Sequence, residues 1–260
     1  LKKNPLIFHL YISFMSQKKI KTASLVIIGN EILSGRTQDK NINYIAKELF
    51  KSGISLKFIC VIPDLQKQII KTIKNLKKSY DFILTTGGIG PTHDDITAES
   101  ISIALKKKYL LHKGAHKELK KYYKKVNSEL TQSRMKMAYM PVGSKLIKNS
   151  VSGAPGFNIE NIYVFAGIPS IVKAMTKEFL KMIKVKNKFY SSSIVTKLFE
   201  SKIAHILERA EKSFKDVSIG SYPIFDGKPK GVEVVISSMT NKNNAMSARK
   251  YIIREINKII

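Results

Sequence analysis

The sequence predicts an α/β fold in which helices sandwich a parallel sheet, followed by a small C-terminal α+β domain. Two observations predict it. Strand-like and helix-like segments alternate through the first half of the chain, an order typical of parallel sheets with helical crossovers. The strand-like segments, such as residues 23–28 and 56–62, are also unbroken apolar runs, as expected of strands that are buried on both faces.

The helices of the larger domain are predicted from apolar residues at helical spacing. The helix over 41–50 has Asp39 as a candidate cap, Phe50 on its apolar face and Gly53 as its stop. Residues 114–140 are helical and strongly charged, and we expect them to form an insertion that covers one edge of the sheet. The other expected elements are a helix over 65–78, a strand over 81–85, a helix over 96–107, a strand over 162–165 and a helix over 169–183.

The composition changes toward Lys and Asn near residue 186, and this change marks a domain boundary. We expect a nucleotide- or pterin-binding domain over 20–185 and an α+β domain over 186–260. Residues 1–19 are expected to be a disordered extension, because their apolar stretch is too short to span a bilayer and no signal-peptide cleavage site follows it. The smaller domain is expected to contain strands over 189–199, 217–222 and 231–239 and helices over 201–213 and 243–258.

The composition indicates a cytoplasmic protein without a membrane or a specific nucleic-acid partner. A single cysteine, Cys60, excludes an internal disulfide and fits a reducing compartment. The formal net charge of +27 is compatible with nucleic-acid binding. However, 41 of the 46 basic residues are Lys, they are spread along the whole chain, and base readout favours Arg. A solvated Lys-rich surface, attractive to anionic substrates, is the simpler interpretation.

A glycine-rich loop follows the third predicted strand, with Gly87, Gly88 and Gly90 within four residues. Glycines let the backbone approach a ligand closely, and the N-terminus of the next helix suits a phosphate. The loop matches neither a Walker A motif nor a dinucleotide fingerprint, and an ordinary strand–helix turn is the alternative. The candidate ligand-binding residues of this segment are Thr86, Gly87, Gly88, Gly90, Pro91 and Thr97.

Asp94 and Asp95 come directly after this loop. One aspartate could cap the following helix, but two adjacent carboxylates beside a phosphate are repulsive unless a cation such as Mg²⁺ lies between them. We therefore interpret Asp94 and Asp95 as catalytic residues and, together with Glu31, as candidate metal ligands. Asp64 is a candidate for orienting a water molecule, although Glu31 and Asp64 could equally be turn residues.

Ligands of parallel α/β sheets bind beyond the carboxyl ends of the strands, and four predicted strands of this chain end in unusual residues. We expect these ends to converge on one edge of the sheet. Arg36 could clamp a phosphate there, or lie on the surface. The further candidates at these ends are Gly29, Glu31, Asp64, Gly167, Pro169 and Ser170.

Four segments, in order, resemble motifs of the CinA-type competence/damage-inducible proteins. They are Gly29-Asn30-Glu31-Ile32-Leu33-Ser34-Gly35-Arg36-Thr37, Thr85-Thr86-Gly87-Gly88-Ile89-Gly90-Pro91-Thr92-His93-Asp94-Asp95-Ile96-Thr97, Ser152-Gly153-Ala154-Pro155-Gly156-Phe157 and Ala166-Gly167-Ile168-Pro169-Ser170.

The resemblance implies a MoaB/Mog molybdopterin-binding-like fold, in which Asp64 and Asp95 match the two functional aspartates. It also implies a short form without the C-terminal amidase domain and with a KH-like domain over 186–260. That domain lacks a Gly-x-x-Gly loop, so RNA binding does not carry over. A dimer or trimer of identical chains is expected.

The resemblance leaves three functions open. The first is hydrolysis of the pyrophosphate bond of ADP-ribose or FAD with Mg²⁺ or Co²⁺, with K⁺ as a further cofactor. The second is binding or adenylylation of molybdopterin. The third is a non-catalytic role in DNA uptake or damage. The segment from Thr92 to Asp95 resembles the domain of eukaryotic FAD synthase linked to FAD hydrolysis, whereas Asn30 replaces an Asp of many relatives.

Overall fold

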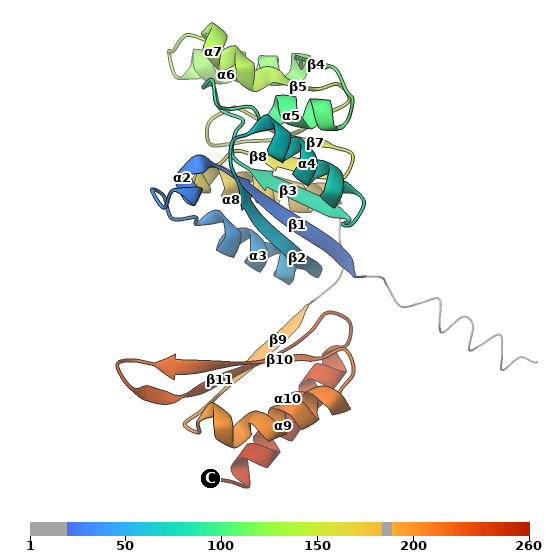
Figure 1. The fold of residues 1–260 in the computed structure, drawn as a ribbon, viewed down its shortest axis with the longest axis vertical. Helices are drawn as coiled ribbons and strands as arrows, with labels where there is room; N and C mark the ends of the chain where they lie inside the picture. The colour runs from blue at the N-terminus through green and yellow to red at the C-terminus, as the bar shows by residue number, and fades with distance from the viewer. Residues whose placement is uncertain (1–19, 184–188) are drawn as a thin grey trace, which may run out of the picture. The chain divides into compact units, whose positions relative to one another are not determined.

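The computed structural model describes residues 20–183 and 189–260, so the predicted extension over 1–19 lies outside the described residues. The described chain divides into two compact units on either side of residues 184–188. Each unit is described by itself below (Figure 1).

The larger unit contains a six-stranded sheet in the order β2-β1-β3-β8-β7-β6. Four strands are parallel, namely β2 (Ile54–Ile62), β1 (Lys21–Ile28), β3 (Phe82–Thr86) and β8 (Ile162–Phe165). The fold class is confirmed, and the sheet is mostly rather than wholly parallel. Two short antiparallel strands complete the sheet, β7 (Gly156–Ile159) and β6 (Lys145–Ile147), and segments of three or four residues are too short to show a strand period.

Helices cover both faces of this sheet, so the predicted sandwich is present (Figure 1). On one face, α4 (Gln66–Lys77) and α5 (Thr97–Ala104) bury Ile69, Ile73 and Ile101 against the strands. On the other face, α3 (Asn41–Lys51) and α8 (Pro169–Ile183) bury Ile45 and Phe179. Asp39 accepts hydrogen bonds from the backbone N–H groups of Asn41 and Ile42, which makes it the cap of α3.

Two residues expected inside the protein are partly exposed. Phe50, at the end of α3, is 37% exposed. Cys60 is only partly buried, and its neighbours Phe58 and Ile59 are exposed as well. For Cys60 the reason is that β2 is an edge strand, so its apolar run is covered less completely than that of the inner strands.

The segment expected to be helical over 114–140 forms several elements instead. The helix α6 (Lys113–Lys125) is followed by the short helix α7 (Gln132–Met135), the 3-10 helix η1 (Lys136–Ala138) and the strand β5 (Tyr139–Pro141), which pairs with β4 (Tyr109–Leu111). Asn127 adopts a left-handed φ of 48°, which ends the helical path. The prediction of helical structure is therefore correct for residues 113–125 and 132–138 and wrong for the strand that follows.

The smaller unit has all five predicted elements. Its antiparallel sheet has the order β10-β11-β9, with β9 (Tyr190–Thr196), β10 (Ser218–Phe225) and β11 (Pro229–Ser238). The helices α9 (Glu200–Ser213) and α10 (Lys242–Asn257) close a core that includes Ile203, Val234 and Ile252. In the described parts of both units, no helix combines the length and the apolar character that a bilayer crossing needs.

Candidate functional site

A cleft of about 550 Å³ lies at the carboxyl ends of the parallel strands. The loops after β1, β2, β3 and β8 all contribute to its wall, together with residues of the β6–β7 loop and of η1. The cleft therefore brings together most of the candidate residues, namely Gly29, Glu31, Asp64, Gly87, Gly88, Gly90, Pro91, Asp94, Asp95, Gly167 and Pro169.

Four candidates do not line this cleft. Arg36 is exposed in the loop after α2 (Asn30–Leu33), and Ser170 lines a different groove on α8. Thr97 is fully buried behind the glycine loop. Thr86 lines a cavity of about 70 Å³ beside the cleft. Sequence proximity placed these residues near the site, but the directions of their side chains separate them from the cleft wall.

Gly87 is fixed by the approach of two neighbouring strands. Its φ is +99°, and a Cβ atom there would lie 2.1 Å from the carbonyl oxygen of Ile28 at the end of β1. Its N–H donates to the carbonyl of Phe165 at the end of β8. The glycine loop is thus held between the ends of β1 and β8, where no other residue type fits.

Buried oxygen atoms without a hydrogen-bond partner surround this loop in the described part of the chain. They include Oγ1 of Thr86, Oγ1 of Thr97 and Oδ1 of Asn41. Asn41 and Thr86 share the small cavity, and Nδ2 of Asn41 donates to the carbonyl of Gly167. Because buried polar atoms are normally paired, these atoms indicate that a ligand group or ordered water completes the site. Asn41 lies four residues beyond the first motif, and a polar residue at the start of a predicted helix was the sequence signal for it.

Asp64 receives opposing influences from its surroundings. Its Oδ2 accepts a hydrogen bond of 2.8 Å from the backbone N–H of Asn30. Burial is the largest influence and raises the pKa of Asp64, the negative charges of Glu31 and Asp94 raise it further, and the Asn30 hydrogen bond opposes them. The charges of Glu31 and Asp94 therefore act on Asp64 in the cleft, and together with burial they favour its protonated form.

Asp94 and Asp95 both bind Thr92. The Thr92 hydroxyl lies 2.5 Å from Oδ1 of Asp94 and 2.6 Å from Oδ2 of Asp95, which also accepts the Thr92 N–H. Neither aspartate caps α5, so the capping alternative is excluded for this structure. The Thr92 hydrogen bond lowers the pKa of Asp94, which thus stays ionised while the pKa of Asp64 moves upward.

A lysine that sequence reasoning missed reaches this loop. Nζ of Lys136, at the start of η1, donates to the backbone carbonyls of Thr92 and His93. Its charge also contributes to the lowered pKa of Asp94. The sequence offered no signal, because Lys136 lies 44 residues from Thr92 among many lysines.

Apolar side chains form the remaining wall of the cleft. Ile168 is 59% exposed there, and Ile89 and Met137 line the same space. A flat ring system could pack against these three side chains while phosphates occupy the glycine loop.

Residues 24–185 match the sequence family described as "Probable molybdopterin binding domain". A protein of Archaeoglobus fulgidus is 36% identical over 199 residues, which cover 76% of this chain and 84% of that protein. A CinA-like protein of Fusobacterium nucleatum is 36% identical over 178 residues, which cover 67% of this chain and 44% of that protein. The chain belongs to the CinA-like branch of the molybdopterin-binding-domain family.

Two further matches extend this CinA-like assignment. The crystal structure of the protein CinA of Thermoplasma acidophilum aligns with a TM-score of 0.57 and 30% identity, covering 63% of this chain and 98% of that one. Residues 188–260 match the family described as "FAD synthase, middle domain". The resemblance noted from the four motifs is therefore confirmed at the level of the family.

A divalent metal in this CinA-like protein would have to share its coordination with a ligand. Among the described residues, no group of three or more His, Cys, Asp or Glu side chains is already arranged to hold a metal. Mg²⁺, however, usually takes one or two carboxylates and completes its shell with phosphate oxygens and water. Asp94 and Asp95, with Glu31 near them in the cleft wall, supply carboxylates of this kind.

Replacing Lys136 by Met is expected to loosen the loop of this CinA-like protein. A hydrogen bond from a charged donor at a half-exposed position contributes about 1 kcal/mol. Its loss corresponds to roughly fivefold faster amide exchange, because the locally open state is more populated. Amide hydrogen exchange of residues 92–95 measures it, with Lys120→Met on α6 as the matched control. Unchanged exchange in the Lys136 variant would contradict the role of its ammonium group.

Proposed function

We propose that this CinA-like protein hydrolyses a nucleotide pyrophosphate bond, with substrates of the ADP-ribose or FAD type and a divalent metal such as Mg²⁺ or Co²⁺. The observation that carries the proposal is the cleft at the strand ends. It places the glycine loop, three carboxylates and an apolar wall around one space.

The chain's own residues suit each part of this reaction. Backbone N–H groups of Gly88 and Gly90 can donate to the diphosphate, and Ile168 offers a surface to the base or flavin ring. Asp94 and Asp95, with Glu31, would hold the metal, which when bound neutralises charge on the diphosphate. Asp64 accepts the proton of the attacking water, whose oxygen bonds to one phosphorus as the bridging P–O bond breaks. The products are AMP and a second phosphomonoester.

The match of residues 188–260 to the FAD synthase middle domain supports FAD as a substrate beside ADP-ribose. The Thr-His-Asp-Asp form of the central loop points the same way. A direct comparison of the two substrates at equal concentration measures the preference.

The decisive experiment incubates the purified protein with ADP-ribose or FAD and Mg²⁺ or Co²⁺ and measures AMP. AMP is expected from the wild-type protein and from Asp226→Asn, in which an exposed carboxylate of the smaller unit is lost. It is not expected from Asp95→Ala. Equal AMP formation by wild-type and Asp95→Ala protein, or none by either, would reject the proposal.

A second candidate function is binding or adenylylation of molybdopterin, and the family match over 24–185 is the observation that favours it. The apolar wall and the glycine loop would accept a pterin and its phosphate as readily as a nucleotide. Pterin fluorescence in the purified protein, or saturable binding of added molybdopterin, would support this function. A protein that shows neither, yet forms AMP, would restrict the site to nucleotides.

A further inference from the structure

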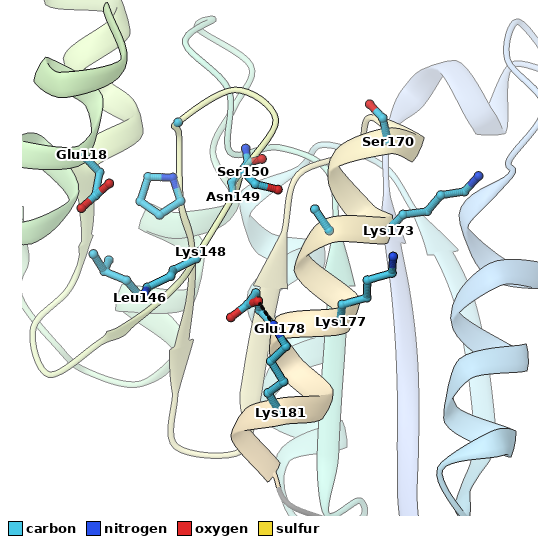
Figure 2. Close-up of a pocket in the computed structure, with 13 residues that line it drawn as sticks. Glu118, Leu146, Lys148, Asn149, Ser150, Ser170, Lys173, Lys177, Glu178 and Lys181 are labelled. Carbon is cyan, nitrogen blue, oxygen red and sulfur yellow. Dashed lines mark hydrogen bonds and ion pairs between the residues drawn. The ribbon is translucent and has the colours of Figure 1, made fainter. Parts of the chain in front are cut away.

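A second cavity, of about 680 Å³, lies between α8 and the loop that joins β6 to β7. Figure 2 shows Ser170, Lys173, Lys177 and Lys181 along α8, and Lys148 on the chain segment beside it. We call this cavity the lysine groove. None of the functions considered above uses it.

The lysine groove and the central cleft share one wall without sharing a lining residue. Ser152 and Ala154 line the cleft, whereas Gly153 and Pro155 line the groove. Asn149 fixes this wall, because its Nδ2 donates to Oγ of Ser152 and to the carbonyl of Ala154 at 2.7 and 2.9 Å. Its Oδ1 also accepts backbone N–H groups of the same loop. A fully bonded buried amide gives a stiff partition, so the two cavities are separate sites.

Positive charge dominates the lysine groove. Lys148, Lys173, Lys177 and Lys181 line it, against Glu118 and Glu178. Lys181 is paired with Glu178 at 2.6 Å, and Nζ of Lys173 lies over the ring of Tyr44. Within the described residues, Lys148 and Lys177 have no ion-pair partner, and both are exposed. Two unpaired ammonium groups in one concave site attract an anion.

The rest of the lining indicates which anion fits. Ser150 and Ser170 offer hydroxyl groups, and no aromatic side chain is among the lining residues. The one large apolar side chain, Leu146, is partly covered. Nucleobases bind by stacking on aromatic rings, whereas ammonium groups bind phosphate as point charges. The groove thus suits phosphate groups, and its lining offers no aromatic ring on which a base could stack.

We propose that the lysine groove is a second binding site, specific for a small anion that carries several phosphate groups and no nucleobase. Lys148 and Lys177, the two lining lysines without an ion-pair partner among the described residues, supply its binding charge. Inorganic pyrophosphate and tripolyphosphate are the probes of this chemistry.

Calorimetric titration of the metal-free protein with tripolyphosphate at low salt tests the proposal. The double variant Lys148→Gln/Lys177→Gln is expected to bind at least about tenfold more weakly, because both unpaired ammonium groups of the groove are lost. The matched control is Lys71→Gln/Lys74→Gln, two exposed lysines of α4 outside the groove. It loses the same charge and is expected to bind like the wild type.

Three results would overturn the site. The first is equal weakening of tripolyphosphate binding in the two double variants, which would indicate unspecific attraction. The second is wild-type affinity in the Lys148→Gln/Lys177→Gln variant. The third is loss of binding in the single variant Asp95→Asn, which would place the probe in the central cleft. AMP is expected to bind more weakly than pyrophosphate, and tighter binding of AMP would contradict the exclusion of a base. Because the titration involves no turnover, its outcome does not depend on whether the protein hydrolyses the pyrophosphate bond of a nucleotide.

Discussion

Replacing Asp64 by Asn is expected to lower kcat/KM for hydrolysis of the nucleotide pyrophosphate bond by a factor of about 10²–10⁴, because a positioned general base contributes a factor of this size. Asparagine keeps an oxygen that accepts the Asn30 N–H, so the loop geometry is preserved. It cannot accept the proton of the attacking water. Steady-state AMP formation measures the effect, with Asp226→Asn as the control for the loss of one carboxylate. A variant that retains more than half of the wild-type kcat/KM would exclude Asp64 as the base.

The same substitution is expected to leave the Tm of the metal-free protein unchanged or higher at pH 7. Burial and the charges of Glu31 and Asp94 raise the pKa of Asp64 in the folded state. Because the pKa of Asp64 is raised on folding, protonated Asp64 stabilises the folded state at a pH below the pKa that Asp64 has in the unfolded chain. This stabilisation is lost as the pH rises through the pKa that Asp64 has in the folded state. Ionised Asp64 therefore costs stability at pH 7, and asparagine removes this cost.

Thermal unfolding of the Asp64→Asn and wild-type proteins between pH 3 and pH 7 tests whether ionised Asp64 destabilises the fold. The difference in Tm between Asp64→Asn and the wild type should shrink as the pH falls below the ordinary pKa of aspartate. A lower Tm at pH 7, constant across this range, would show that Asp64 stabilises the fold instead.

Replacing Gly87 by Ala is expected to have the largest effect on stability, about 2–5 kcal/mol for the larger unit. Backbone strain at a positive φ costs about 1–3 kcal/mol, and overpacking adds a similar amount. Overpacking is unavoidable here, because the added Cβ would lie 2.1 Å from the backbone oxygen of Ile28. We expect a fall in Tm of about 5–15 °C and loss of ligand binding, because the ends of β1 and β3 must separate.

Gly35→Ala is the matched control for this prediction. Gly35 also has a positive φ, of +71°, but a Cβ atom there would meet nothing within 4 Å. Only the strain of about 1–3 kcal/mol remains, and the fall in Tm should be the smaller one. Thermal unfolding of the two variants separates strain from collision. Equal falls in Tm would show that the contact with Ile28 relaxes without cost.

Much of the fold follows from local pattern. The apolar runs before Gly29 and Gly87 determine buried strands, and apolar residues at helical spacing, such as Ile69 and Ile73, determine the covering helices. The convergence of Glu31, Asp64 and Asp94 also follows from the sequence, because each comes shortly after a parallel strand.

Other features were decided by tertiary contacts rather than by local pattern. The pairing of β6 with β7, the position of Lys136 beside Thr92 and the shared wall at Ser152 have no local signature. The short strands β6 and β7, unlike the fully apolar β8, and a single lysine among many carry too little pattern to be recognised. The sequence by itself thus determined which strands carry functional residues at their ends. The tertiary structure alone decided which side chains face the cleft, because that direction depends on packing against segments far along the chain.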